Sequence, residues 1–317
     1  FAQDLKGGNK ERWWPDLMRS AALALGQLCQ ANNDEDSPDR GYSELLAETA
    51  KSHKDDQTRF FALLALGQIG GGRNQQFLLR VLEADTLPKE RPWAAIALGV
   101  QAFASHQAQL QKDEVPQPQS RIGEALTRQL EKAKQPELIG ALGIALGLTR
   151  HLDAADLMRK RMLANLANEQ LAGYLCIGLG MMRDLASIED LAHIANASSR
   201  NTWLLVQAST ALGLLGDKTA AAELHEVMDS PNTPVATFAA AASALGDVGD
   251  LQAIAPLKRR LLDEQLTDLR RAFAAVSLGG IADHAMLPWH TKISTNFNYR
   301  AAVETLTNRQ SGVLDIL

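Results

Sequence analysis

The tripeptide Ala-Leu-Gly, or a close variant of it, recurs eight times along the chain and ends each time at a glycine. These glycines are Gly26, Gly67, Gly99, Gly147, Gly180, Gly213, Gly246 and Gly279. The last five are spaced 33 residues apart. A separate series of aspartates has the same spacing: Asp184, Asp217, Asp250 and Asp283. Two series with one period predict a chain built from repeated structural units.

Composition and local signals indicate that each unit is a pair of helices. Alanine and leucine occur 49 times each among 317 residues, and both favour helices. In one unit, Asp217 is expected to cap a first helix over Lys218–Met228. Pro231 then breaks the chain, and a second helix is expected over Val235–Val248.

Three prolines support this division. Pro15, Pro88 and Pro136 each lie 11 residues before a repeat glycine. This spacing places them in the first turn of the second helix, where the missing backbone N–H costs nothing.

The repeat glycine near the end of each second helix requires a physical reason. Glycine inside a helix costs about 1 kcal/mol relative to alanine, so its recurrence predicts that the backbones of stacked helices approach closely. A unit of this size cannot bury its own apolar face, and the units must therefore stack. The predicted fold is all-α, a right-handed α-α superhelix of about eight helix pairs. We expect one domain over residues 1–317, with regular repeats over about 14–282 and a degenerate C-terminal cap and tail over 283–317.

Two segments carry a resemblance to a known repeat family. They are the decapeptides Arg-Arg-Ala-Phe-Ala-Ala-Val-Ser-Leu-Gly at 270–279 and Ala-Ala-Ser-Ala-Leu-Gly-Asp-Val-Gly-Asp at 241–250. This pattern resembles HEAT repeats, in particular the class named after the phycobilin (PBS) lyases. The resemblance implies an armadillo-like stack of helix pairs. It does not assign a function, because this class includes scaffolds, lyases, hydroxylases and DNA glycosylases.

Few sequence motifs indicate a catalytic or metal-binding site. The HEAT-like deoxyhypusine hydroxylases bind iron through His-Glu pairs on the second helices, and none occurs at that position here. The sole pair, His225-Glu226, lies on a first helix and is interpreted, together with His193, as part of a solvated face. Cys29 and Cys176 form no metal-binding or disulfide pattern. No nucleophile, metal-protease, phosphate-loop or dinucleotide motif is present, so we expect neither a catalytic residue nor a cofactor or metal.

Charge and hydropathy narrow the range of partners. The net charge is −5, which disfavours nucleic acid as a partner. The basic clusters Arg159–Arg161 and Lys258–Arg260 are interpreted as solvated charge on first helices. No apolar run approaches the ~18 residues needed to span a bilayer. The chain starts at Phe1 rather than methionine, which predicts a processed or excised protein. The sequence does not decide between a cytoplasmic protein and an exported one whose leader has been removed.

An apolar stripe on the second helices is the main candidate site. Positions seven and three before the repeat glycine and one after it are four residues apart and share a helix face. In the middle repeats these positions are mostly apolar, and we predict that they bind a partner. The predicted binding residues are Phe60, Leu64, Ile96, Ile144, Leu148, Ile177, Met181 and Val206.

Three interpretations of this stripe remain open at this point. In the first, the stripe is an open groove for a partner or ligand. In the second, it is covered from within, by the insertion at 107–120, by the tail at 312–317, or by a groove so tightly curved that its opposite walls touch. In the third, the helix rotation is displaced by one position. The favoured function is a non-enzymatic scaffold that binds a protein or peptide in an apolar concave groove. The alternative is a lyase-like or chaperone subunit that holds a hydrophobic cofactor, with Trp93, Tyr174 and Trp203 flanking a planar ligand.

Overall fold

The computed structural model describes residues 14–283 apart from 33, 35, 113–114, 116–118, 198–201, 217–220 and 231–232. Within these residues the regular secondary structure is helical, with no strand. The α-helices are α2 (Trp14–Leu28), α3 (Pro38–Ser52), α4 (Asp56–Ile69), α5 (Gly72–Glu83), α6 (Arg91–Gln111), α7 (Ser120–Lys132), α8 (Pro136–Thr149), α9 (Ala155–Ala164), α10 (Glu169–Met182), α11 (Ile188–Ala197), α12 (Thr202–Leu214), α13 (Ala221–Asp229), α14 (Val235–Val248), α15 (Ile254–Leu262) and α16 (Asp268–Asp283). Single 3₁₀ turns, η1 (Leu152–Ala154), η2 (Leu185–Ser187) and η3 (Leu251–Ala253), precede α9, α11 and α15.

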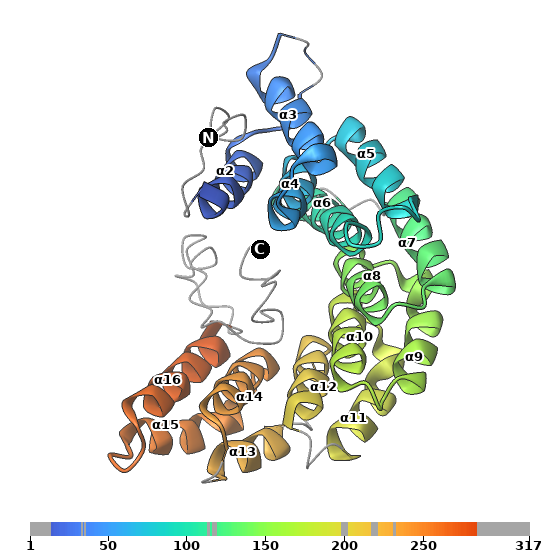
Figure 1. Cartoon of the computed structure of the whole chain (residues 1–317). Helices are drawn as coiled ribbons and strands as arrows, with labels where there is room; N and C mark the ends of the chain where they lie inside the picture. Colours follow the sequence, from blue (N-terminus) through green and yellow to red (C-terminus); the bar gives the residue numbers. More distant parts are fainter. Residues whose placement is uncertain are drawn as a thin grey trace. The chain divides into compact units, whose positions relative to one another are not determined.

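The helices form an all-α solenoid of HEAT-like pairs, and the chain divides into two compact units. Unit 1 is Phe1–Leu157 and unit 2 is Met158–Leu317, so the division falls inside α9. We call the helices that contain the repeat glycines the B helices; these are α2, α4, α6, α8, α10, α12, α14 and α16. The others are the A helices. In each unit the B helices form one layer and the A helices the second (Figure 1).

The pairing agrees with the sequence in most respects. All eight repeat glycines lie in B helices, and α14 covers the predicted span Val235–Val248. Seven B helices have an A helix before them in the described part of the chain. The expectation for Pro88 is wrong, because α6 begins three residues later at Arg91 and Pro92 occupies its first turn. Asp217 and the predicted C-terminal cap lie outside the described residues.

The B helices approach to backbone contact at five of the repeat glycines, Gly26, Gly67, Gly99, Gly180 and Gly213, which confirms at these positions the packing that the sequence predicted. A Cβ added to Gly99 would lie 2.8 Å from Ala145 Cα, and one added to Gly180 would lie 2.8 Å from Ala211 Cα. Real Cβ atoms essentially never make such contacts with backbone. The glycine therefore sets the spacing between neighbouring repeats, and this explains why the helix accepts its low propensity.

The ends of the B helices also repeat. In α8, α10 and α14 the third residue after the repeat glycine adopts a left-handed conformation: Arg150 (φ 52°), Arg183 (φ 62°) and Gly249 (φ 65°). A left-handed residue at this place lets the chain turn while the last carbonyls of the helix remain bonded. The aspartate series follows directly. Asp250 accepts a bond from Gln252 N at 3.2 Å, whereas the Asp184 carboxylate lies 3.5 Å from Arg159.

Arginines near the start of the B helices connect neighbouring repeats in unit 1. Arg19 donates to both carboxylate oxygens of Asp55, at 3.1 and 3.0 Å. Arg59 donates to Glu90 from two nitrogens, at 3.0 and 2.9 Å. Burial alone would raise the pKa of Asp55, but hydrogen bonds from Arg19 and Thr58 outweigh it and lower the pKa to about 2. The carboxylate therefore stays charged at neutral pH and holds the two repeats together.

Candidate functional site

The predicted stripe is not an open surface in this structure. Seven of its eight residues are buried, with exposed fractions of 2% to 7%, and Met181 alone is half-buried. The seven buried residues are Phe60, Leu64, Ile96, Ile144, Leu148, Ile177 and Val206. The expectation of an exposed strip is therefore wrong for these seven. Because the repeat glycines bring adjacent helices together, side chains near the contact lose their access to solvent. Their assignment as partner-binding residues stays a prediction.

Aromatic contacts account for one end of the stripe in unit 1. The rings of Phe60 on α4 and Trp93 on α6 are stacked, with centroids 5.1 Å apart and an interplanar angle of 9°. Phe61 meets Trp93 edge-on at 6.1 Å. This cluster joins two neighbouring B helices. Trp93, which the sequence suggested as a wall for a planar ligand, is 8% exposed and already has aromatic partners in the protein.

The rotation of the B helices explains part of the difference between the predicted exposed stripe and the observed buried one. Two successive steps of four residues overshoot the helical period of 3.6, so the position seven before the glycine turns toward the neighbouring helix. On α10 this position is Gly173, where a Cβ would lie 2.8 Å from the Gln207 side chain of α12. The residue six before the glycine is half-buried on α4, α8 and α10, where it is Phe61, Ala141 and Tyr174. On α6 and α12 it is buried, as Trp93 and Gln207.

In unit 2, α10 carries two half-buried residues seven positions apart and α12 two that are eleven positions apart, and these spacings place each pair on one helix face. We call these four residues the B-face patch: Tyr174, Met181, Trp203 and Leu214. The tyrosine hydroxyl accepts a hydrogen bond from Gln170 Nε2 at 3.1 Å. Thr210 is also half-buried on α12 and adds a hydroxyl beside the apolar residues. The group holds aromatic, thioether and aliphatic side chains on two helices that pack against each other.

Buried polar atoms without partners lie beside the B-face patch. Trp203 Nε1 and both amide atoms of Gln207 are buried and have no hydrogen-bond partner among the described residues. Gln207 itself is 1% exposed and contacts the Gly173 position of α10. Leaving a buried donor or acceptor unpaired costs free energy. Sequence reasoning missed Gln207, although a glutamine six before the repeat glycine, where most other repeats have an apolar or aromatic residue, was a visible signal.

Replacing Gln207 by methionine is expected to raise the free energy of unfolding by about 1 kcal/mol, because an unpaired amide is exchanged for an apolar chain of similar length. Urea denaturation followed by circular dichroism measures this change. The control is Gln129→Met in unit 1, which removes the oxygen that accepts from Arg91 at 2.8 Å and should lower stability. A loss of stability in Gln207→Met would mean that this amide has a partner.

Neither cysteine has the properties of a catalytic nucleophile. Burial raises the pKa of the Cys176 thiol to about 12. Burial also raises the pKa of Cys29, and the nearby Asp39 carboxylate adds to the effect. A thiol must ionise to attack, so both groups stay protonated at neutral pH.

His225, which the sequence analysis placed on a solvated face, is half-buried and contacts a neighbouring arginine. His225 Nδ1 lies 2.9 Å from Arg260 Nη1, and Arg260 also holds Asp229 Oδ1 at 2.6 Å. Burial and the arginine together lower the pKa of His225. The interpretation of Arg260 as solvated charge is wrong, since the residue is 8% exposed, whereas Lys258 and Arg259 are exposed as expected. Between residues 14 and 283, where described, no group of three or more His, Cys, Asp or Glu is placed to hold a metal ion.

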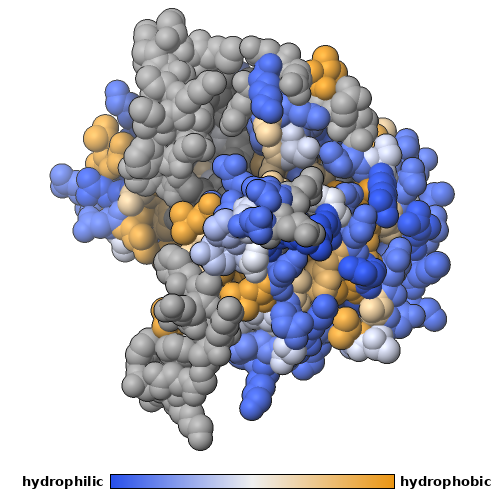
Figure 2. Space-filling view, turned by 90° about the horizontal axis from the view of Figure 1, so that it is seen from above, coloured by the Kyte–Doolittle hydropathy of each residue, from blue (hydrophilic) through white to orange (hydrophobic). Residues whose placement is uncertain are grey.

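Polar residues cover much of the surface seen in the space-filling view. Hydrophilic residues predominate on this face wherever the structure describes it, and hydrophobic residues form smaller patches between them (Figure 2). No helix in the described part of the chain is long and apolar enough to cross a membrane.

Comparison with known proteins agrees with this architecture. The HEAT-repeat family profile matches residues 188–279, which run from α11 into α16. None of the curated protein sequences matches the chain significantly. Among solved structures, the fold is similar to that of the complex of CpcE and CpcF of phycocyanin lyase from Nostoc sp. PCC7120. The TM-score is 0.54 at 17% identity, over 82% of this chain and 92% of that one. Residues 188–279 therefore carry HEAT repeats, and the fold of the chain resembles that of the phycocyanin lyase structure.

Proposed function

We propose that the chain is a non-enzymatic scaffold that binds a protein segment at the B-face patch of unit 2. The observation that carries the proposal is the set of half-exposed side chains on α10 and α12, namely Tyr174, Met181, Trp203 and Leu214. Tyrosine, tryptophan and methionine are enriched at protein interfaces because they combine large contact area with adaptable or polar ends. The patch replaces the buried stripe as the proposed contact surface, and Met181 belongs to both.

A polypeptide matches the polar groups of this patch as well as its apolar ones. The Tyr174 hydroxyl and the Thr210 hydroxyl can each exchange hydrogen bonds with a peptide backbone. One of the similar solved structures is a complex of CpcE and CpcF of phycocyanin lyase, which supports a protein as the occupant. The second candidate is a subunit that holds a hydrophobic cofactor, for which Tyr174 and Trp203 provide two aromatic rings in one unit. A purified protein that is coloured or fluorescent in the visible range would favour that candidate.

The double variant Tyr174→Asp with Met181→Asp tests the proposal. Both side chains are half-buried, so helicity should survive while two charges on the patch remove partner binding. The measurement is affinity capture with quantitative mass spectrometry, followed by titration of the captured and identified protein against the purified variant. The matched control is Leu185→Asp with Leu251→Asp, which changes two exposed leucines elsewhere in unit 2.

Loss of binding in the patch variant but not in the control is the expected result. An unchanged titration with the patch variant would refute the assignment of this surface. A third variant, Ile177→Asp with Met181→Asp, separates surface from core. Ile177 is buried, so this variant should lose helicity as well as binding.

A further inference from the structure

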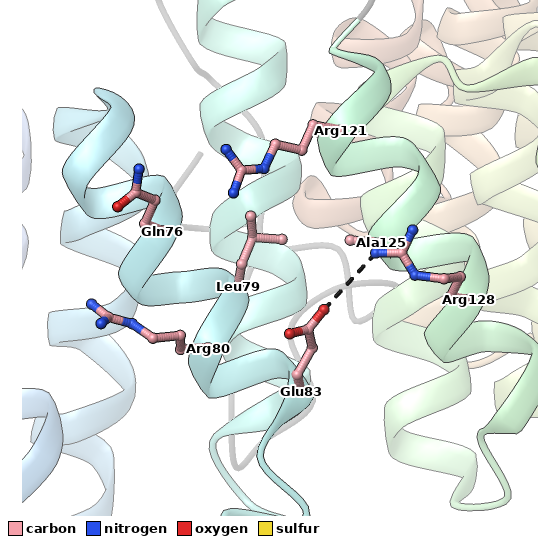
Figure 3. Close-up of a pocket in the computed structure, with 7 residues that line it drawn as sticks. All are labelled: Gln76, Leu79, Arg80, Glu83, Arg121, Ala125 and Arg128. Atoms are coloured by element: carbon pink, nitrogen blue, oxygen red, sulfur yellow. Dashed lines mark ion pairs between the residues drawn. The ribbon is translucent and has the colours of Figure 1, made fainter.

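The A helices of unit 1 carry a cavity that the proposed function does not use. A hollow of about 330 Å³ lies between α5 and α7. It is lined by Gln76, Leu79, Arg80, Glu83, Arg121, Ala125 and Arg128 (Figure 3). Leu79 and Ala125 are buried, so the hollow has an apolar floor and a polar rim. Figure 3 shows Arg121 extending from α7 toward α5 across this space.

The charge of this hollow is mostly uncompensated. Its single carboxylate, Glu83, is 3.9 Å from Arg128, and both side chains are about half exposed. Arg80 and Arg121 have no hydrogen bond or ion pair with any described residue. Two guanidinium groups therefore face water at the edge of a concave surface. Arginine binds carboxylate and phosphate in a planar, two-pronged geometry, so these groups are suited to an anionic ligand.

A second hollow continues the same surface. It has a volume of about 180 Å³, lies beside α3 and α5, and shares Arg80 with the first. Glu44 is its one acidic lining residue, paired with Arg40 at 3.2 Å and with Arg73 at 3.4 Å. Lys51 also lines it, 5.6 Å from the centre of the Phe77 ring.

Together the two hollows form a basic track across α3, α5 and α7. Its cations are Arg40, Lys51, Arg73, Arg80, Arg121 and Arg128. Two carboxylates, Glu44 and Glu83, oppose these six, which leaves a local excess of four positive charges. The whole chain carries a net charge of −5. Such a separation of charge attracts an acidic partner to this face.

We infer that the basic track binds an acidic, extended segment of a protein partner. Adjacent helices lie about 10 Å apart, and an extended chain rises about 3.3 Å per residue. Acidic side chains at every third position would therefore meet α3, α5 and α7 in turn. Glu44 and Glu83 disfavour the dense, uniform charge of a nucleic-acid backbone, whereas a peptide can place its carboxylates to either side of them. The single aromatic residue in the lining, Phe77, is half-buried beside Lys51, so the track has no open platform for stacking bases.

The test uses the full chain and three fluorescein-labelled probes at 50 mM NaCl. They are a ten-residue peptide with glutamate at every third position, its glutamine counterpart, and a ten-nucleotide thymidine strand. The variant is Arg80→Glu with Arg121→Glu. The control is Lys258→Glu with Arg259→Glu, which reverses two exposed charges of unit 2. Circular dichroism shows that each variant is folded, and fluorescence anisotropy measures each Kd.

The glutamate peptide is expected to bind, and the track variant to weaken that binding about ten-fold because two ion pairs become repulsions. The control variant and the glutamine peptide distinguish a site from general attraction. Three results would overturn the inference: no saturable binding of the glutamate peptide, equal weakening by the control variant, or tighter binding of the thymidine strand. The B-face patch is untouched in every variant, so this test and the test of the proposed function fail independently.

Discussion

Replacing Gly67 by alanine is expected to destabilise unit 1 by about 3 kcal/mol, since overpacking against a rigid neighbour costs 1–3 kcal/mol. The new Cβ would lie 2.8 Å from Ala97 Cα and closer still to the Ala97 carbonyl oxygen. Both atoms belong to the backbone of α6, which cannot move aside as a flexible side chain can. The two B helices would have to separate, and the aromatic stack of Phe60 on Trp93 between them would loosen.

Gly279 provides a control of opposite sign. It is also a repeat glycine in a B helix, but no heavy atom of the described residues lies within 4 Å of its added Cβ. Gly279→Ala should therefore stabilise the chain by up to about 1 kcal/mol through helix propensity alone. Urea denaturation gives both free-energy changes, and hydrogen exchange localises the first to α4 and α6. If Gly67→Ala were as stable as Gly279→Ala, close approach would not be the reason for the glycine.

Arg59→Met is expected to lower stability by about 3 kcal/mol, because removing one partner of a buried ion pair leaves the second charge uncompensated. Arg59 holds Glu90 through two nitrogens, and it also donates to His53 O and Asp56 Oδ1, at 2.8 Å each. Glu90 is 6% exposed and would lose both of its bonds to Arg59. The second variant, Arg59→Met with Glu90→Leu, should recover most of the loss, since it removes the stranded carboxylate.

Arg73→Met is the matched control for this experiment. Arg73 pairs with Glu44 at 3.4 Å, and both side chains are more than half exposed. Exposed pairs contribute about 0–1 kcal/mol, so the control should change stability little. Urea denaturation measures the free energy of unfolding of Arg59→Met, of Arg59→Met with Glu90→Leu, and of Arg73→Met, and so compares a buried ion pair with an exposed one. Equal losses in Arg59→Met and Arg73→Met would show that burial of Glu90 is unimportant.

Parts of the architecture could be read from the sequence because they depend on local periodicity. The repeat glycines identified the B helices and their close contacts, and α14 has the predicted bounds. Arg19 and Arg59 stand near the start of their B helices in the sequence, but their role in joining repeats was not visible there. That role requires the residue before the next B helix, such as Asp55 or Glu90, to lie within reach of the arginine.

The candidate surfaces were harder to predict, and the reasons are geometric. In the sequence analysis, the stripe was placed by counting in steps of four residues, whereas an α-helix has 3.6 residues per turn. The error adds up over two turns, so that near the start of α10 the more exposed residue is Tyr174 instead of Gly173. Ile144 and Ile177, which the sequence analysis placed on a partner-binding stripe, are buried in the structure.

The sequence by itself determined that this chain folds as stacked HEAT-like helix pairs, since one period, carried by glycine and aspartate, leaves no other way to bury the apolar faces. Tertiary structure alone decided which side chains face solvent. It buried Arg260 against Asp229. It also placed Arg80 and Arg121 on opposite sides of one hollow, although they lie far apart in the sequence and their separation does not follow the repeat period. Helix periodicity is a local property that a sequence displays, whereas exposure and charge clustering depend on how neighbouring helices are spaced and rotated.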